Sequence, residues 1–224
     1  MTPQVRTHRK LTPSQEDYLK SLYQLGGEAG SVGTSQLADR LGVSAASATE
    51  MLGKLASQGL VAHDRYRGAS LTAEGVRLAL EIVRHHRLLE MYLTRKLGYG
   101  WDEVHEEAEE LEHVISERME ERIFEALGRP EVDCHGDPIP TLGGEVAETD
   151  YRSLEEVTAG ERVRVRRVSD RDPGKLRVLE RLGLRLGSEV DVVDQSEYEG
   201  PIGVRVAGRY RHVPLGVARV VFVE

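Results

Sequence analysis

The sequence predicts a mainly α-helical protein with a small amount of β structure, divided into three domains. Residues 1–75 have the pattern of a winged helix-turn-helix DNA-binding domain. Residues 76–148 form long amphipathic helices that carry many acidic and histidine side chains, followed by a linker. Residues 149–224 contain short strands separated by Gly and Pro, which is typical of a small β-barrel.

The composition indicates a soluble protein of a reducing compartment. Hydrophobic residues make up 39% of the 224, enough for packed cores. Cys134 is the single cysteine, so no internal disulfide can form. No apolar run approaches the roughly 18 residues of a membrane span, and the polar start has no signal-peptide core. We therefore expect a cytoplasmic protein with no membrane partner.

The net charge of −8 is unevenly distributed. Counting Lys and Arg against Asp and Glu gives +1 for residues 1–75, −10 for residues 76–148 and +1 for residues 149–224. The acidic excess in the middle third indicates either bound cations or an acidic surface. The near-neutral first third remains able to approach a polyanion.

The first third predicts three helices and a hairpin. Thr12 begins a helix with a capping box and Pro at its first position, and this helix stops at Gly26-Gly27. Thr34 caps a short helix to Leu41, and Ser44 opens another that runs to about Gln58. Two short strands, Leu60–His63 and Ala69–Thr72, then enclose a basic turn. This order is the winged helix-turn-helix pattern.

The helix that begins at Ser44 is rich in small and hydroxyl side chains, which allow a helix to lie deep in a major groove. Arginines at the tip of the hairpin would reach the phosphate backbone or the minor groove. The alternative is a winged helix that contacts only protein. The DNA-contacting candidates are Ser44, Ala46, Ser47, Thr49, Lys54, Arg65 and Arg67.

The middle third predicts two long helices with metal-type side chains. The first, from Ala73 to about Lys96, carries His86 and Glu90 one turn apart. A short Gly-containing turn leads to an acidic stretch, residues 105–113, that we expect to form one continuous helix to about Leu127. At about 100° per residue, four side chains of this stretch share one side of the helix: His105, Glu109, Glu112 and His113. Carboxylates and imidazoles together suit a divalent first-row metal, although acidic helices are often simply solvated.

After Gly128, the pattern becomes less regular. Cys134 and His135 lie in a loop, where such a pair is usually incidental, and residues 137–150 have the composition of a linker. Strands are expected at residues 163–165, 190–193, 203–206 and 217–223, with a helix from Lys175 to Leu182. Four arginines near the first strand, either solvated or available to DNA or a partner, are Arg162, Arg164, Arg166 and Arg167.

These motifs together resemble a known family. The winged helix is followed by His-Arg-Leu-Leu-Glu at 86–90, Val-His-Glu-Glu-Ala-Glu-Glu-Leu-Glu-His-Val at 104–114 and His-Gly-Asp-Pro-Ile-Pro at 135–140. This order is similar to the diphtheria toxin repressor family of metal-dependent transcriptional repressors, especially its manganese-responsive branch. The resemblance implies a homodimer, a palindromic operator in double-stranded DNA, a divalent metal as corepressor, control of metal-homeostasis genes, and an SH3-like (FeoA-like) C-terminal domain.

The resemblance also implies two metal sites. The primary site maps to Asp17, Glu109, Glu112 and His113. The second site maps to His86, Glu90 and His105, with Asp172 contributed by the C-terminal domain. Iron-responsive members have Met and Cys where this chain has Asp17 and Glu109, so the resemblance favours Mn(II), with Fe(II) or another divalent transition metal as the alternative. Lys20 stands where many manganese-type members have a further Glu, which implies two separate sites.

Two other function classes remain open at this point. The carboxylates and histidines could serve a metal-dependent hydrolase, although the sequence offers no further nucleophile or base nearby and the winged helix would be unexplained. A regulator that senses an organic ligand is the other, but it would not need four ligating side chains on one helix stripe. We therefore expect a DNA-binding regulator and no enzyme.

Overall fold

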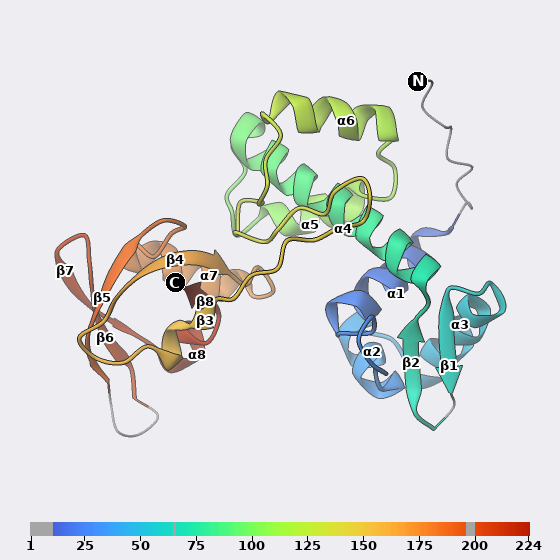
Figure 1. Ribbon diagram of the computed structural model, residues 1–224, viewed down its shortest axis with the longest axis horizontal. Coiled ribbons are helices and arrows are strands. Elements are labelled where there is room, and N and C mark those ends of the chain that lie inside the picture. Colours follow the sequence, from blue (N-terminus) through green and yellow to red (C-terminus); the bar gives the residue numbers. More distant parts are fainter. Residues whose placement is uncertain (1–10, 65, 196–199) are drawn as a thin grey trace. The chain divides into compact units, whose positions relative to one another are not determined.

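The computed structural model describes residues 11–64, 66–195 and 200–224 (Figure 1). The chain forms two compact units. The first ends at Val83 and includes Leu142–Gly144, and the second comprises Arg84–Thr141 and Glu145–Glu224. Within the described residues, none of the helices is long and apolar enough to cross a membrane.

The first unit is a winged helix. Thr12 caps α1 with the expected capping box, because its side chain accepts from the Gln15 amide and the Gln15 side chain accepts from the Thr12 amide. Ser44 caps α3 in the same way, through the Ser47 amide. Thr34 was expected to be a cap but is already helical, and Gly33 takes the cap position. The elements of this first unit are α1 (Pro13–Gln24), α2 (Thr34–Leu41), α3 (Ala45–Ser57), β1 (Val61–Asp64), β2 (Gly68–Leu71) and the start of α4 (Ala73–Tyr92).

The wing is the antiparallel pair β1–β2, which is fixed to the rest of the unit by an isolated bridge between Val32 and Ala69. Gly68 is required here. Its φ is +94°, and a Cβ at this position would lie 2.1 Å from the Val32 carbonyl oxygen. Behind the wing, the core of the unit is apolar and includes the fully buried Leu19, Leu37 and Leu52. Burial of these side chains supplies most of the unit's stability.

The second unit begins with the rest of α4, which ends in a short π-helical turn at Leu93–Leu97. The acidic stretch forms α5 (Val104–Leu111), and α6 (Glu117–Ala126) follows it. The prediction of one continuous helix is therefore wrong. Ser116 has extended backbone angles, and its side chain accepts from the Met119 amide, so it caps a new helix. Met119 consequently leaves the predicted apolar stripe and is 52% exposed.

The segment before residue 141 is packed and is not the linker that its composition indicates. Val132 bridges to Pro138, and Ile139 is buried. Arg84 donates to the Pro140 carbonyl oxygen at 2.7 Å. Exposed, irregular chain follows only in residues 141–150. Side-chain contacts made by α4 therefore hold this segment in place, and local composition does not show them.

The C-terminal part is a six-stranded antiparallel sheet around its own core, with strand order β3-β8-β4-β5-β6-β7. Val165, Val190 and Val204 are fully buried within it. The strand expected at residues 217–223 is shorter, because a helical turn precedes it. The elements are β3 (Arg152–Ser153), η2 (Leu154–Glu156), β4 (Arg162–Val168), α7 (Pro173–Leu182), β5 (Glu189–Gln195), β6 (Ile202–Val206), β7 (Arg209–Val213), α8 (Leu215–Ala218) and β8 (Val221–Val223).

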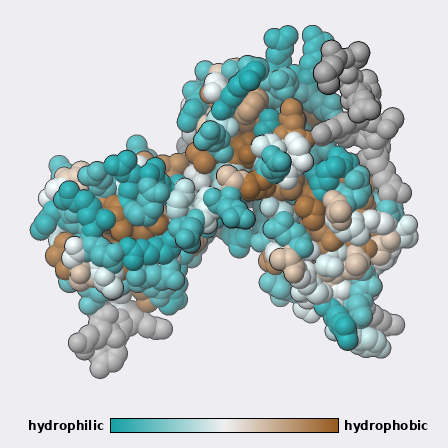
Figure 2. All heavy atoms as spheres, viewed as in Figure 1, coloured by the Kyte–Doolittle hydropathy of each residue, from teal (hydrophilic) through white to brown (hydrophobic). Residues whose placement is uncertain are grey.

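The arginines of β4 are paired with carboxylates of the second unit. Arg162 donates to Asp191 at 2.5 Å and Arg164 to Glu189 at 3.1 Å, across the β4–β5 pair. The remaining two pairs are Arg166 with Glu224 and Arg167 with Asp137. Figure 2 shows mostly hydrophilic side chains over the visible face of this sheet domain. These pairs make the arginines parts of a solvated, charge-balanced face, so they are weak candidates for DNA contact.

Candidate metal centre and nucleic-acid interface

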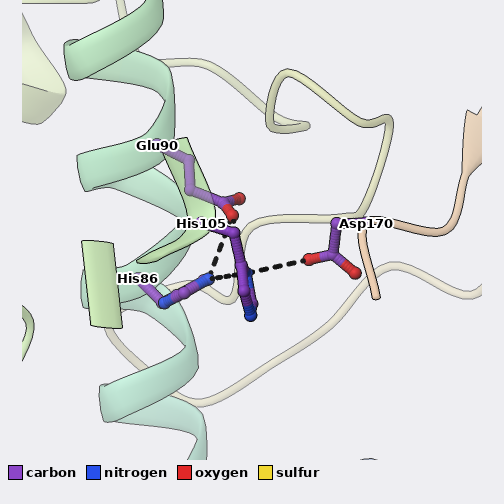
Figure 3. A group of neighbouring side chains, drawn as sticks. All are labelled: His86, Glu90, His105 and Asp170. Atoms are coloured by element: carbon purple, nitrogen blue, oxygen red, sulfur yellow. Dashed lines mark hydrogen bonds and ion pairs between the residues drawn. The ribbon is translucent and has the colours of Figure 1, made fainter. Parts of the chain in front are cut away.

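Three residues assigned to the second metal site lie together (Figure 3). On α4, His86 and Glu90 are one turn apart and are 5% and 0% exposed. His105, from the first turn of α5, faces them: its Nδ1 lies 3.0 Å from His86 Nε2 and 3.2 Å from Glu90 Oε1. His86 Nε2 also lies 3.0 Å from Glu90 Oε1. The two helices thus place three metal-type donors around one point.

A carboxylate from the C-terminal domain completes this group, and it is Asp170. Its Oδ2 lies 3.5 Å from His105 Nδ1 (Figure 3). The expected ligand Asp172 is used elsewhere: it caps α7, and its side chain accepts from the Lys175 amide at 3.2 Å. A donor atom from each of His86, Glu90, His105 and Asp170 lies within 4.8 Å of the others. We call these four residues the second-site group.

His86 also contacts the residues assigned to the primary site. Its Nδ1 lies 2.6 Å from Oε2 of Glu112, which is 2% exposed. His86, Glu109 and Glu112 form another set with donor atoms within 4.8 Å of one another. His113 Nε2 lies 3.8 Å from Glu112 Oε1. The two sets of ligands therefore share one imidazole, a connection that the sequence did not predict.

Asp17 is the remaining residue assigned to the primary site. It lies on α1, in the first unit, and is partly buried. Lys20, one turn further along α1, is 3% exposed. The participation of Asp17 in a metal site stays a prediction.

The structure adds a group that the sequence analysis set aside. Glu90, Cys134 and His135 each offer a donor atom within 4.8 Å of the others. His135 is fully buried, and its Nε2 lies 2.8 Å from the Trp101 carbonyl oxygen, to which it donates. Its Nδ1 faces Glu90 Oε2 at 3.5 Å and Cys134 Sγ at 3.4 Å. The local composition, rich in Gly and Pro, gives no signal for this burial.

The charges of this centre are strongly coupled. Burial raises the pKa of Glu90, but the charge of His86 and hydrogen bonds from His105 and His135 hold it well below its usual value. Burial lowers the pKa of His135, whereas its contacts with Cys134 and Glu90 raise it to about 12. Glu90 is therefore ionised at neutral pH, and the His135 imidazole beside it holds its second proton more strongly than a free imidazole does. A cation that binds here replaces such protons, because ligating imidazoles must be neutral.

These residues fit a divalent metal. Glu90 Oε2 is buried, and among the described residues it meets His135 Nδ1 in a long ion pair of 3.5 Å; a buried carboxylate is costly unless nearby charge compensates it. Carboxylates and imidazoles are the donors that divalent first-row metals use. The residues that would hold the metal are the second-site group together with Glu109, Glu112 and His113.

A charged framework holds the loop that carries His135. The Asp133 Oδ1 atom accepts from the amides of His135 and Asp137 at 2.8 and 2.9 Å. Arg87, one residue after His86, lies 3.6 Å from Asp133 and 3.4 Å from Asp137. Burial raises the pKa of Asp133 to about 7, and the neighbouring Asp137 adds to this effect. These contacts fix the position of His135 relative to α4.

The outward face of α3 is polar and small, as a DNA-reading helix requires. Ser44, Ala46 and Ser47 are exposed, and the Ser44 and Ser47 hydroxyl oxygens lie 2.9 Å apart. Thr49 donates its hydroxyl hydrogen to the Ala45 carbonyl oxygen at 2.8 Å. Lys54 is exposed near the end of the helix and pairs with Glu50 at 2.8 Å.

The tip of the wing is also exposed. Tyr66 is 93% exposed, and Arg67 beside it is exposed as well. The tip is shaped by the Tyr66 amide, which donates to Asp64 Oδ1 at 2.9 Å, and by Ser31, whose hydroxyl donates to the Arg67 carbonyl oxygen at 2.5 Å. Arg65, the other candidate contact, lies outside the described residues.

Comparison with known proteins identifies all three parts. Residues 10–69 match the model described as "Iron dependent repressor, N-terminal DNA binding domain". Residues 72–141 match "Iron dependent repressor, metal binding and dimerisation domain", and residues 152–224 match "FeoA domain". These ranges follow the order of the winged helix, the helical part and the sheet domain.

Similar proteins include both iron- and manganese-dependent repressors. The diphtheria toxin repressor of Corynebacterium efficiens is 31% identical over 197 residues, covering 84% of this chain and 86% of that protein. The iron-dependent repressor IdeR of Mycobacterium bovis is 36% identical over 135 residues, 59% of this chain and 58% of that protein. A solved "Manganese-dependent transcriptional repressor complex with manganese" is 42% identical, with a TM-score of 0.86. The match covers 93% of this chain and 98% of that chain.

A winged helix joined to a helical domain with a metal-type cluster defines a metal-dependent DNA-binding repressor, and not an enzyme. The chain belongs to the diphtheria toxin repressor (iron-dependent repressor) family, with a FeoA domain at its C-terminal end. The hydrolase alternative is therefore set aside.

Proposed function

We propose that this protein is a manganese(II)-responsive repressor that binds a palindromic operator as a homodimer and controls metal-homeostasis genes in the cytoplasm. The observation that carries the metal assignment is the set formed by His86, Glu109 and Glu112. It contains oxygen and nitrogen donors and no sulfur, and hard oxygen ligands suit Mn(II). The similarity to a manganese-dependent repressor over most of both chains adds support.

An iron(II)-responsive repressor is the second candidate, because curated relatives of this chain are iron-dependent repressors. Raw affinity does not separate the two, since most sites bind Fe(II) more tightly than Mn(II). The donor set is the property that distinguishes them. A thiolate in place of the Glu109 carboxylate shifts the preference toward softer metals.

We further propose that the primary site includes Asp17 of α1 with Glu109, Glu112 and His113. A cation bound both by Asp17 and by the residues of the helical domain holds the winged helix in a fixed orientation relative to that domain, which forms the dimer. Without it, three carboxylates repel one another, and the winged helix can turn. Two recognition helices must be about 34 Å apart to enter successive major grooves. A few kcal/mol of differential binding is enough to populate this arrangement.

The second-site group has a different role in this proposal. Asp170 reaches His105 from the C-terminal domain, so a cation bound there joins that domain to α4 and α5. The domain boundaries that we propose for these roles are residues 1–75 for DNA binding, 76–148 for dimerisation and metal binding, and 149–224 for the FeoA domain.

The metal assignment is tested by anaerobic titration of Mn(II) and Fe(II) into the wild-type protein, E109C and E106C, with DNA binding measured by gel shift on the region upstream of the protein's own gene. Glu106 is an exposed acid of the same helix outside the donor set. We expect E109C alone to respond to Fe(II) at a lower concentration relative to Mn(II). An unchanged ratio in E109C contradicts the assignment.

The role of Asp17 is tested by D17N, with D39N as the control, since Asp39 is an exposed acid of α2. We expect D17N to lose metal-dependent operator binding and D39N to keep it. Operator binding by D17N with wild-type metal dependence would exclude Asp17 from the switch.

A further inference from the structure

An acidic side chain lies at the centre of the DNA-facing side of α3. The buried residues Ala48, Leu52 and Leu55 mark the side of α3 that packs on the core. At about 100° per residue, the opposite direction is occupied by Ala46, Glu50 and Gly53. The Glu50 side chain is 71% exposed and is the single carboxylate of this helix. It therefore points directly away from the core, toward the DNA that α3 is proposed to contact.

The neighbours of Glu50 leave room for close approach. Ala46, one turn before it, has only a methyl group. Gly53, one turn after it, has none, and a Cβ at Gly53 would meet nothing within 4 Å. Of the residues on the centre line of α3 up to Gly53, Glu50 alone has a side chain long enough to extend well beyond the helix backbone.

A carboxylate in this position needs a specific partner in DNA. Phosphates repel it, and it accepts hydrogen bonds without donating any. In the major groove, amino groups of cytosine (N4) and adenine (N6) are donors, but adenine presents the acceptor N7 beside its amino group. The carboxylate is therefore matched by cytosine and disfavoured by guanine and thymine, which present acceptors there.

We propose that Glu50 is a specificity-determining residue that accepts a hydrogen bond from N4 of a cytosine in each half-site. This inference rests on the proposed binding of α3 in the major groove. It adds a base-reading role to a helix whose other exposed residues are small, hydroxylic or cationic.

Lys54 supports this role from the next turn of the helix. Its Nζ lies 2.8 Å from Glu50 Oε1. The hydrogen bond and charge of Lys54 lower the pKa of Glu50, so the carboxyl group is ionised at neutral pH. The ammonium group also offsets part of the repulsion between the carboxylate and the phosphates, which permits an acid to enter the groove.

The test is selection of bound duplexes from a random-sequence DNA library by the full-length protein with Mn(II). The variants are E50Q, E50A and the charge-matched control E28Q, since Glu28 is an exposed acid outside α3. Wild type and E28Q should select the same half-site, with cytosine at one position. E50Q should replace cytosine by adenine there, because a Gln amide pairs with adenine N6 and N7. The relative affinity for the two bases should change about tenfold.

E50A should lose the preference for cytosine without gaining one for adenine. An E50Q half-site identical to that of wild type would overturn the inference. So would an equal gain of affinity for all sequences in E50Q and E28Q, because Glu50 would then act through charge alone. Failure of the wild type to enrich any duplex with Mn(II) or Fe(II) would instead overturn the proposed DNA binding on which the inference rests.

Discussion

The winged helix and the helical metal centre use burial in opposite ways. In the winged-helix unit, the buried polar side chains among the described residues are Gln15, Lys20 and Ser21. In the second unit, the buried polar side chains among the described residues are all arginine, carboxylate or histidine side chains: Arg84, His85, His86, Glu90, Glu112, Glu120, Asp133 and His135. The candidate DNA contacts of the first unit lie on its surface, whereas the second unit buries much of its candidate metal centre, including His86, Glu90 and Glu112.

This difference follows from what each part binds. A DNA-reading surface must offer its polar groups to phosphates and base edges, so its stability comes from an apolar core. The candidate metal centre removes several ionisable side chains from water, which is costly unless each charge has a partner. The second unit meets that cost with ion pairs, and a bound cation adds to them. We therefore expect its stability to depend on individual charges and on metal much more than that of the winged helix.

The largest effect is expected from removal of a buried charge. Glu120 accepts from Arg84 and lies 3.2 Å from His85 Nε2, and all three side chains are buried. The substitution Glu120→Ala leaves Arg84 without its carboxylate partner and should lower the free energy of unfolding by about 3–5 kcal/mol. Urea unfolding followed by the fluorescence of Trp101, the single tryptophan, reports on this unit.

The matched control is Glu125→Ala. Glu125 is on the same helix and also pairs with an arginine, but both side chains are exposed. Water already screens this pair, so the variant should unfold at nearly the same urea concentration as wild type. Equal effects of the two substitutions would contradict the view that buried charge is what makes this unit sensitive.

Metal binding is expected to have the next largest effect on the free energy of unfolding. At a free Mn(II) concentration of about 100 times its Kd, the Trp101-reported unfolding free energy should rise by about 2.7 kcal/mol over the EDTA-treated protein. Hydrogen exchange of the amides of α3 should change much less than that of α4, because the ligand proposed for the winged helix, Asp17, lies on α1 and α3 carries no proposed ligand. Equal protection of both units by Mn(II) would show that the contrast between them is wrong.

The smallest effect is expected in the dependence of stability on pH below neutrality. Burial raises the pKa of Glu120, but the hydrogen bond with His85 and the charge of Arg84 outweigh it and hold the pKa below its usual value. The stabilisation is therefore complete above the unfolded-state pKa of about 4.3 and is lost as the pH falls through the lower folded value. Below pH ~4.3, wild type should lose stability more steeply than E120Q, by at most about 1.4 kcal/mol per pH unit for one proton. Parallel slopes in the two proteins would rule out this contribution.

Contacts within one helix turn were mostly predicted correctly from the sequence, with the expected cap at Thr34 as the exception. The capping box at Thr12, the cap at Ser44 and the hairpin after α3 are as expected, because a cap needs only its own helix turn. The fold class and the repressor family are confirmed by the family matches and the solved structures. The same local reasoning missed the break before α6, since Ser116 lies in a stretch whose apolar spacing alone favours one helix.

The differences between expectation and structure at the centre have two physical causes, one local and one that joins distant segments. Asp170 and Asp172 are equally acidic and two residues apart, and the choice between them depends on which one caps α7. Residues 137–140, the start of the predicted linker, are packed because Arg84 and Arg87 donate to the carbonyl oxygens of Pro140 and Pro138. Such contacts join segments more than fifty residues apart, and periodicity and composition carry no information about them.

The sequence by itself determined the order of the parts, the helices that carry the candidate ligands and the chemical type of those side chains. These properties depend on residue identity and on spacing within a few turns. The tertiary structure alone decided that His86 lies between Glu112 and Glu90, that His135 is buried behind them, and that Asp170 reaches His105. Packing of distant segments brings these groups together, because burial of each charge is tolerated only where another charge or a donor meets it.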